Sequence, residues 1–242
     1  MTLPGASGSL GARVAAAGLD WIVPDWPAPP RVCALSTTRN ARAGQKFDLT
    51  RSDPQFETAR SELRRWLPAE PIWLAQVHGT AICDADAVSA LRSRGLPEGD
   101  GALARAPNTV CAVHSADCLP VLFTDAQGSV VAAAHAGWRG LAAGVLEAAL
   151  AAMRTPPANV LAWLGPAIGP QAFEVGADVL AAHCDNDPAA ARCFMPHRPG
   201  KWFGDLYALA RRRLTRAGVA SIYGGGRCTF SEPDAFYSYR PD

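Results

Sequence analysis

The sequence has no strong excess of charge of either sign. Its 242 residues include 23 Lys and Arg against 22 Asp and Glu, which gives a formal net charge of +1. Proteins that bind nucleic acid or an anionic membrane usually carry a basic patch or stripe. We therefore expect neither of these partners. With 49% hydrophobic and only 19% charged residues, the chain has ample material for a large core.

Long hydrophobic runs are also missing. No stretch approaches the ~18 consecutive apolar residues that a membrane-spanning helix needs. The N-terminus has neither the basic start nor the apolar run of a signal peptide, because Arg13 and Asp20 bracket only a short alanine stretch. We expect a soluble, cytoplasmic protein.

The seven cysteines form no CxxC pair and follow no regular spacing. An odd number of cysteines in a chain of this length argues against a disulfide framework and for reduced thiols in the cytoplasm. The sequence contains no internal repeat, low-complexity block or long linker. We therefore expect an N-terminal tail over residues 1–20 and a single domain over residues 21–242.

Apolar periodicity and turn residues predict a mixed α/β domain. Apolar runs predict strands at residues 31–37, 71–77, 110–113, 121–123, 130–134, 159–164 and 220–223. Apolar residues at helical spacing predict helices at residues 56–67, 141–153, 178–183 and 205–217. Residues 185–201, between the last two helices, are expected to form a surface excursion.

Three potential metal ligands, His78, Cys118 and His135, each follow a predicted strand and lie among small residues. Two imidazoles and one thiolate leave one tetrahedral position of a zinc ion open, as in catalytic zinc sites. A metal held in this way can activate water or polarise a carbonyl group. The three residues are far apart in the sequence, so their spacing alone is not diagnostic.

Other interpretations of the same residues stay open at this point. Cys118 can be a small buried hydrophobe, which is a common role of a free cysteine. His78 and His135 can be hydrogen-bonded loop residues. A third interpretation dispenses with the metal and makes Cys118 a nucleophile with His135 as its base.

Several longer segments carry a more specific signal. They are QVHGT (76–80), CAVHSADCLPVLF (111–123), AAAHAGWRGLAAGVLE (132–147), LAWLGPAIGPQAFEVG (161–176), DLYALARRRL (205–214), GGGRCT (224–229) and FYSYR (236–240). Together they closely resemble the YfiH family, whose members have been named polyphenol oxidase or multicopper laccase, purine nucleoside phosphorylase, and peptidoglycan editing factor. The resemblance extends, with gaps, from about Trp21 to Arg240.

The resemblance implies a single α/β domain with mixed sheets flanked by helices, in α/β/β/α layers. It also implies one metal ion, usually zinc, held by the residues that match His78, Cys118 and His135. The implied activity is phosphorolysis of adenosine, inosine or methylthioadenosine, with deamination of adenosine in the same pocket. The expected partners are thus a purine nucleoside and phosphate, bound by a monomer.

Four further residues are candidates for the site. Arg39 matches a Thr-Arg pair of the family and suits phosphate, although the loop at 40–44 departs from the family's usual Gly-Gly-Val-Ser. Asp117 can orient a ligand histidine, accept a proton or cap the turn. Arg139 can bind an anion at the start of the following helix or form a surface ion pair. His114 is a possible extra polar group rather than a ligand.

Two other activities compete with the phosphorylase. One is hydrolysis of a wrongly incorporated amino acid from a UDP-muramic acid precursor of the cell wall. The other is copper-dependent oxidation of phenols. A laccase needs several copper ions and about ten histidine ligands, whereas this chain has five histidines. We therefore expect zinc, with copper as the alternative metal.

Overall fold

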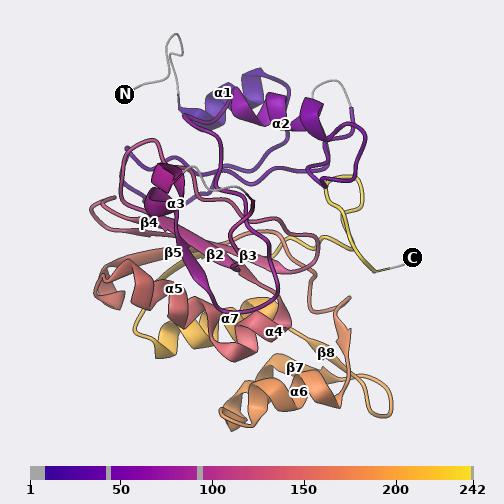
Figure 1. Cartoon of the computed structure of the whole chain (residues 1–242). Helices are drawn as coiled ribbons and strands as arrows, with labels where there is room; N and C mark the ends of the chain where they lie inside the picture. The colour runs from indigo at the N-terminus through magenta and orange to yellow at the C-terminus, as the bar shows by residue number, and fades with distance from the viewer. Residues whose placement is uncertain (1–8, 42–44, 92–94, 241–242) are drawn as a thin grey trace.

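A mixed six-stranded sheet forms the centre of the molecule (Figure 1). The computed structural model describes residues 9–41, 45–91 and 95–240. In order across the sheet, the strands are β1 (Ile82–Asp84), β2 (Gly101–Ala104), β4 (Val131–Ala136), β3 (Leu119–Asp125), β5 (Val160–Leu164) and β9 (Ser221–Gly224). The outermost pairs, β1 with β2 and β5 with β9, are parallel, and the pairs between them are antiparallel.

The central strands are almost continuously apolar because both faces of the sheet are covered. Every residue of β2 and β5 is buried, a pattern typical of strands that are packed on both sides. Three helices, α4 (Trp138–Ala143), α5 (Val145–Met153) and α7 (Leu206–Arg216), lie below the sheet in Figure 1. They share the main core with the strands through side chains such as Phe123 and Leu146.

A layer of N-terminal residues lies on the other side of the sheet (Figure 1). It contains α1 (Leu10–Ala16) and α2 (Phe56–Arg64), and its own apolar cluster includes Val14, Trp66 and Trp73. Residues 1–8 of the expected tail lie outside the described residues. The following residues form the helix α1, in which Val14 is buried.

A second, three-stranded antiparallel sheet has the order β6-β8-β7. Its strands are β6 (Glu174–Val175), β8 (Trp202–Gly204) and β7 (Phe194–Pro196), and α6 (Ala177–Cys184) lies beside them (Figure 1). Residues 185–201, predicted to form a surface excursion, are exposed at most positions but also have regular structure. Besides β7, they contain the 3-10 helix η3 (Pro188–Cys193), and Ala190 and Phe194 are buried. The short 3-10 helix η2 (Pro157–Asn159) precedes β5, and α3 (Ala85–Leu91) follows β1.

Three predicted strands are also wrong. Residues 31–37, 71–77 and 110–113 form no ladder and pair only through isolated bridges, such as that between Ile72 and Cys111. Their apolar composition reflects packing of side chains against the N-terminal layer and the β2 region, because burial and ladder pairing are separate requirements.

The predicted helix at 141–153 is divided into α4 and α5, and it begins earlier, at Trp138. Gly144 ends α4 with φ of 102°, a left-handed conformation that favours glycine. The remaining predicted helices and sheet strands are present, with boundaries shifted by a few residues.

The predicted fold class, a single α/β domain with mixed sheets flanked by helices, is confirmed. Within the described ranges, no helix combines the length and the apolar character needed to span a membrane.

Candidate metal centre

The pairing of β3 with β4 brings Cys118 and His135 together. The two strands are antiparallel, with Pro120 opposite His135. Cys118, which precedes β3, therefore lies beside the end of β4, where the chain turns at Gly137. His135 is buried and Cys118 is half-buried. The register of β3 with β4 thus brings together two potential ligands that are distant in the sequence.

His78 reaches the same point from an irregular loop. Its φ is 60°, a left-handed conformation that is uncommon for a residue other than glycine. The carboxylate of Asp100 fixes this loop by accepting hydrogen bonds from the backbone N–H groups of Val77 (3.1 Å), His78 (2.9 Å) and Gly79 (2.6 Å). These three hydrogen bonds to one carboxylate stabilise the strained backbone of His78, and they hold its imidazole in place.

The same carboxylate also orients His135. Asp100 Oδ1 lies 2.8 Å from His135 Nδ1, and the Asp100 side chain is completely buried. An ionised carboxylate only accepts hydrogen bonds, so we assign the proton of the imidazole to Nδ1, which leaves the Nε2 lone pair free for a metal. Burial alone would raise the pKa of Asp100, but the hydrogen bonds from His135 and the backbone outweigh it, and the pKa is lowered. One buried residue thus positions two of the three ligands.

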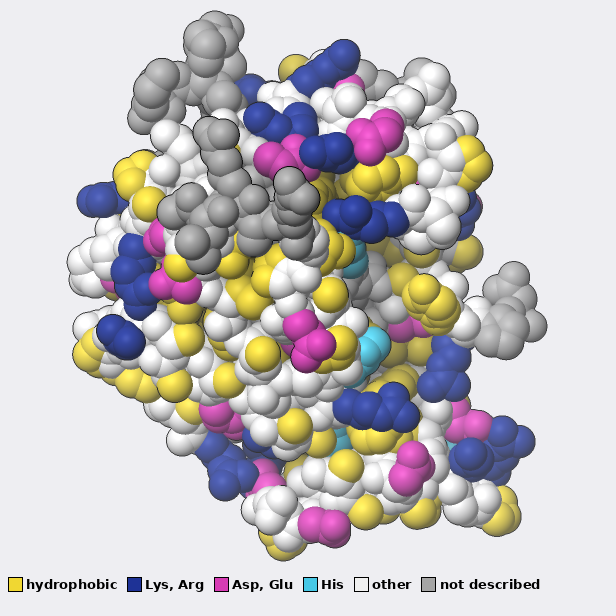
Figure 2. Space-filling view, in the orientation of Figure 1, with side chains coloured by type: hydrophobic (Ala, Val, Ile, Leu, Met, Phe, Trp, Pro, Cys, Tyr) yellow, Lys and Arg dark blue, Asp and Glu magenta, His cyan; other side chains and the backbone are white. Residues whose placement is uncertain are grey.

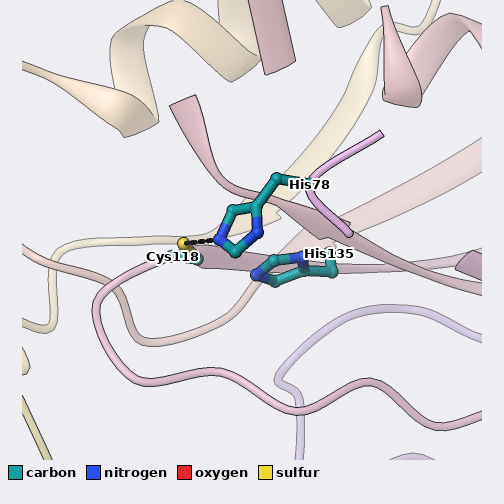
Figure 3. A group of neighbouring side chains, drawn as sticks. All are labelled: His78, Cys118 and His135. Carbon is teal, nitrogen blue, oxygen red and sulfur yellow. Dashed lines mark hydrogen bonds between the residues drawn. The ribbon is translucent and has the colours of Figure 1, made fainter. Parts of the chain in front are cut away.

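The three side chains converge on one point (Figure 3). Their ligand atoms all lie within 4.8 Å of one another, and Cys118 Sγ is 3.8 Å from His78 Nε2. The rings of His78 and His135 meet edge to face, with centroids 4.8 Å apart. Zinc bonds of about 2.0 Å to nitrogen and 2.3 Å to sulfur place tetrahedral ligand atoms roughly 3.5 Å apart. The group therefore fits a tetrahedral metal ion after a small contraction.

The ionisation states also favour a metal over a free nucleophile. Burial lowers the pKa of His135, and the hydrogen bond to Asp100 only partly reverses this, so the ring is neutral at neutral pH. Burial, together with the negative charges of Asp117 and Asp100, raises the pKa of Cys118 to about 11. Nucleophilic cysteines have lowered pKa values. Cys118 would stay a thiol near pH 7 unless a cation were bound beside it.

Two glycines, Gly137 at the bend after β4 and Gly140 in α4, leave room for the His78 loop and the ligands. A Cβ atom on Gly137 would lie 2.8 Å from His78 Cδ2 and 2.9 Å from Cys118 Sγ. A Cβ atom on Gly140 would lie 2.8 Å from the carbonyl oxygen of Gly79. Both contacts are shorter than van der Waals distance, so these two glycines allow the His78 loop to approach the end of β4.

Asp117 lies next to Cys118 but is directed elsewhere. Its carboxylate accepts hydrogen bonds from Thr229 Oγ1 (2.6 Å), Ser238 Oγ (3.0 Å) and the backbone N–H of Tyr239 (2.8 Å). The orientation of a ligand histidine, one of the roles predicted for Asp117, is performed by Asp100. Asp117 binds the C-terminal segment to the loop that carries Cys118. A catalytic role for Asp117 stays a prediction.

Replacing Asp117 by alanine is therefore expected to destabilise the protein. The change removes three hydrogen bonds to a charged group and should lower the free energy of unfolding by about 2 kcal/mol. Urea denaturation checks this value, with the exposed Asp25→Ala variant as the control. Equal stability of the two variants would contradict the anchoring role.

The two candidate arginines lie in different settings. Arg39 donates a hydrogen bond of 2.6 Å to the carbonyl oxygen of Pro233 and stacks on the ring of Tyr237. Arg139 is exposed in the first turn of α4, with its guanidinium over the ring of Trp138. Among the described residues, no carboxylate forms an ion pair with either guanidinium. In the part of the chain that the structure describes, the surface ion pair considered for Arg139 is thus not found. Of the loop that follows Arg39, residues 42–44 lie outside the described residues.

One large cleft connects these residues. Its volume is about 2140 Å³, and it runs between the N-terminal layer and the sheet. The three potential ligands, Arg39, Asp117, Arg139 and His114 all contribute to its lining. Figure 2 shows histidine side chains in the hollowed part of this face, with Lys or Arg side chains beside them. Sites for one small ligand usually measure 300–1,000 Å³, so the cleft has room for a substrate with several parts.

Known proteins resemble this chain over most of its length. Residues 48–242 match the family model described as multi-copper polyphenol oxidoreductase laccase. A relative from Escherichia coli strain K12, purine nucleoside phosphorylase YfiH, is 44% identical over 239 residues, which cover 91% of this chain and 93% of that protein. The chain belongs to the YfiH family.

Further relatives cover a similar share of the chain. A purine nucleoside phosphorylase of Pseudomonas aeruginosa is 46% identical over 229 residues, covering 91% of this chain and 92% of the relative. The crystal structure of a Neisseria meningitidis protein superposes with a TM-score of 0.84 at 45% identity, over 91% of this chain and 93% of that one. YlmD from Geobacillus stearothermophilus gives a TM-score of 0.75 at 26% identity, over 88% of both chains. The fold is thus that of solved YfiH-type structures.

The laccase description does not fit the distribution of histidines in this chain. Within the described residues, His78, Cys118 and His135 are the only group of three or more His, Cys, Asp or Glu side chains arranged to hold a metal. The other three histidines, His114, His183 and His197, each lie against a different aromatic ring. Several copper ions cannot be supplied with ligands from this set.

Proposed function

We propose that the chain is a metal-dependent purine nucleoside phosphorylase that uses zinc. The observation that carries the proposal is the convergence of two imidazoles and one thiol at the wall of a large cleft, with one coordination position left to a substrate or water. The names of the relatives, purine nucleoside phosphorylase in Escherichia coli and Pseudomonas aeruginosa, support this choice of reaction. The proposed nucleosides are adenosine, inosine and methylthioadenosine.

His78, Cys118 and His135 are the proposed zinc ligands, and Asp100 holds two of them. The donor set of two nitrogen atoms and one sulfur atom suits zinc, with copper as a weaker alternative. Bound zinc would supply a Lewis acid and lower the pKa of a coordinated water molecule. The thiol of Cys118 would lose its proton on binding the metal.

Phosphate is proposed to bind near Arg39 and Arg139. Both guanidiniums line the cleft, and neither is neutralised by a carboxylate among the residues described. A planar guanidinium donates paired hydrogen bonds to phosphate oxygens. The phosphate would then attack C1′ of the ribose, and the bond from C1′ to the base would break to release a purine and ribose 1-phosphate. We also propose deamination of adenosine at C6, for which activated water is the required nucleophile.

A cell-wall editing hydrolase is the second candidate, because a metal site with an open position also suits attack on an amide carbonyl. Its version with Cys118 as the nucleophile is disfavoured by the raised pKa of that thiol, about 11. Oxidation of phenols is the weakest candidate, since the described histidines supply only one metal site.

The test is turnover of adenosine and inosine by the full-length protein, with and without phosphate. We expect release of the free base to require phosphate and to be lost after treatment with a chelator and restored by zinc. Conversion of adenosine to inosine should need zinc but not phosphate. His78→Ala protein, purified in the same way, controls for contaminating host enzymes. If the zinc-loaded protein converts none of these nucleosides while it releases serine from a mis-assembled UDP-muramic acid precursor, the hydrolase replaces the phosphorylase.

A further inference from the structure

The imidazole of His114 is held rigidly in the wall of the cleft. Its ring stacks on the indole of Trp73, with centroids 4.7 Å apart and planes inclined by 17°. The side chain of Gln76 fixes the main chain of His114 from both sides: its amide donates to the carbonyl oxygen of His114 (2.9 Å) and its carbonyl accepts from the N–H group (2.7 Å). Gln76 also lies two residues before His78, and His114 lies four residues before Cys118. The backbone of His114 is therefore tied to the two loops that carry His78 and Cys118.

The two ring nitrogens of His114 have different surroundings. Nε2 is sealed from solvent and has no hydrogen-bond partner among the described residues. Nδ1 also lacks a partner there, but it is not among the sealed atoms. A buried N–H group without an acceptor raises the free energy of the folded state more than a buried lone pair without a donor does. We therefore assign the proton to Nδ1, which makes the accessible nitrogen a hydrogen-bond donor.

This ring is neutral at neutral pH. Burial is the main cause of its lowered pKa, and the positive charge of Arg51 and the nearby imidazole of His135 act in the same direction. The carboxylate of Asp48 opposes them without reversing the shift. A neutral imidazole beside an indole makes a flat, weakly polar surface with one directed donor. Such a surface suits a heteroaromatic ring better than it suits phosphate, for which the cleft offers guanidinium groups.

We propose that His114 recognises the heterocycle of the substrate, with Nδ1–H donating a hydrogen bond to an acceptor nitrogen of the purine. The inference rests on the proposed function. His114 is then a specificity-determining residue, which separates purines from analogues that lack the acceptor. The sealed and unpartnered Nε2 fixes the tautomer that makes this donor available.

The experiment measures binding of inosine and of 3-deaza- and 7-deazainosine to the full-length, zinc-loaded protein by calorimetry. Phosphate is left out, so that none of these nucleosides is converted during the titration. Each analogue replaces one acceptor nitrogen by C–H. We expect the wild-type protein to bind one of the two analogues about tenfold more weakly than inosine, the usual effect of one lost hydrogen bond. His114→Phe keeps the stack on Trp73 but has no donor, so it should bind inosine and that analogue equally.

His197→Phe is the matched control, because this histidine also packs on an aromatic ring, that of Phe203, yet lies outside the cleft. It should retain the wild-type preference. Equal binding of all three nucleosides by the wild-type protein would overturn the role of His114, even if His114→Phe does not fold, and would leave the phosphorylase proposal intact. An unchanged preference in His114→Phe would have the same meaning. Absence of any nucleoside binding by the wild-type protein would overturn both proposals.

Discussion

Replacing Asp100 by asparagine is expected to lower the affinity for zinc by at least about tenfold, and up to a hundredfold, the range found when groups that orient metal ligands are lost. The carboxylate makes four hydrogen bonds, to three backbone N–H groups of the His78 loop and to His135 Nδ1. An asparagine offers one accepting oxygen, so its NH₂ group must face a donor. The loop of His78 and the ring of His135 should both lose their fixed orientation. Competition with a chromophoric zinc chelator measures the effect.

The buried carboxylate of Asp125 provides a matched control. It also accepts hydrogen bonds from backbone N–H groups, those of Ser129 and Val130, but it lies at the far end of β3 from Cys118. Asp100→Asn should lower the free energy of unfolding by about 3 kcal/mol. Asp125→Asn should lower it less, because both backbone N–H groups bond to Oδ1 and the Ser129 hydroxyl at Oδ2 can accept a hydrogen bond from the new NH₂ group. Only Asp100→Asn should weaken zinc binding. If both variants kept wild-type zinc affinity, Asp100 would be a purely structural residue.

The pH dependence follows from the lowered pKa of Asp100. A carboxyl group with a folded-state pKa below its unfolded value of 3.8 stabilises the fold above that pH, and this contribution is lost as the pH falls through the folded value. Asp100→Asn has no such group. Its unfolding free energy should therefore fall less steeply than that of the wild type below pH 4, a difference that urea titrations at several pH values can measure.

The candidate ligands could be predicted from the sequence because the residue types and the resemblance to the YfiH family point to the same three side chains, although the spacing alone is not diagnostic. His78, Cys118 and His135 follow apolar runs and stand among small residues, and the structure places their ligand atoms together. Asp100 stands in the sequence between two glycines of a turn-rich segment, and nothing there marks it as a group that orients ligands. Its role depends on the register of β2 with β4, in which the N–H of His135 donates to the carbonyl oxygen of Asp100. That register cannot be read from residues more than thirty positions apart.

Adjacency in the sequence suggested the wrong carboxylate. Asp117 directly precedes Cys118, but its φ of 78° turns the chain there, and its side chain points to the C-terminal segment. The flanking glycines of Asp100 were the better signal, because an acidic residue between two residues without side chains leaves space for close backbone approach. A Cβ atom on Gly101 would lie 2.9 Å from the carbonyl oxygen of Ala133, which shows how closely the strands approach there.

The elements between residues 82 and 104 could not be predicted from periodicity. The strands β1 and β2 have three and four residues, and α3 has seven. These lengths are shorter than the windows in which a helical or alternating pattern can be recognised. The three extended segments that failed to form ladders show the opposite error. They are apolar enough for strands, but their side chains pack against the N-terminal cluster and the β2 region. In both cases the secondary structure depends on tertiary packing rather than on the local sequence pattern.

Replacing Gly137 by alanine is expected to disrupt the metal centre while the fold survives. Gly137 has φ of −62° and ψ of 159°, which alanine adopts freely, so the effect is purely steric. The new Cβ would lie under 3.0 Å from His78 Cδ2 and Cys118 Sγ. The side chains of His78 and Cys118 can rotate away from the new methyl group. This rotation moves the two metal ligands apart. We expect a loss of zinc affinity of about tenfold or more, as for other displaced ligands.

The stability of the same variant should change little, since alanine restricts the unfolded chain and this gain, about 0.4–1 kcal/mol, offsets part of the strain. Gly11→Ala is the control, because no atom lies within 4 Å of the position of its Cβ and it leaves the cleft untouched. Substitution of cobalt for zinc gives a second measurement, in which the absorption band of the cobalt–thiolate bond reports on Cys118 directly. Gly137→Ala should weaken this band, and Gly11→Ala should preserve it. An unchanged cobalt spectrum in Gly137→Ala would mean that the metal is held elsewhere, because a methyl group this close to two ligands cannot leave a site built from them unaltered.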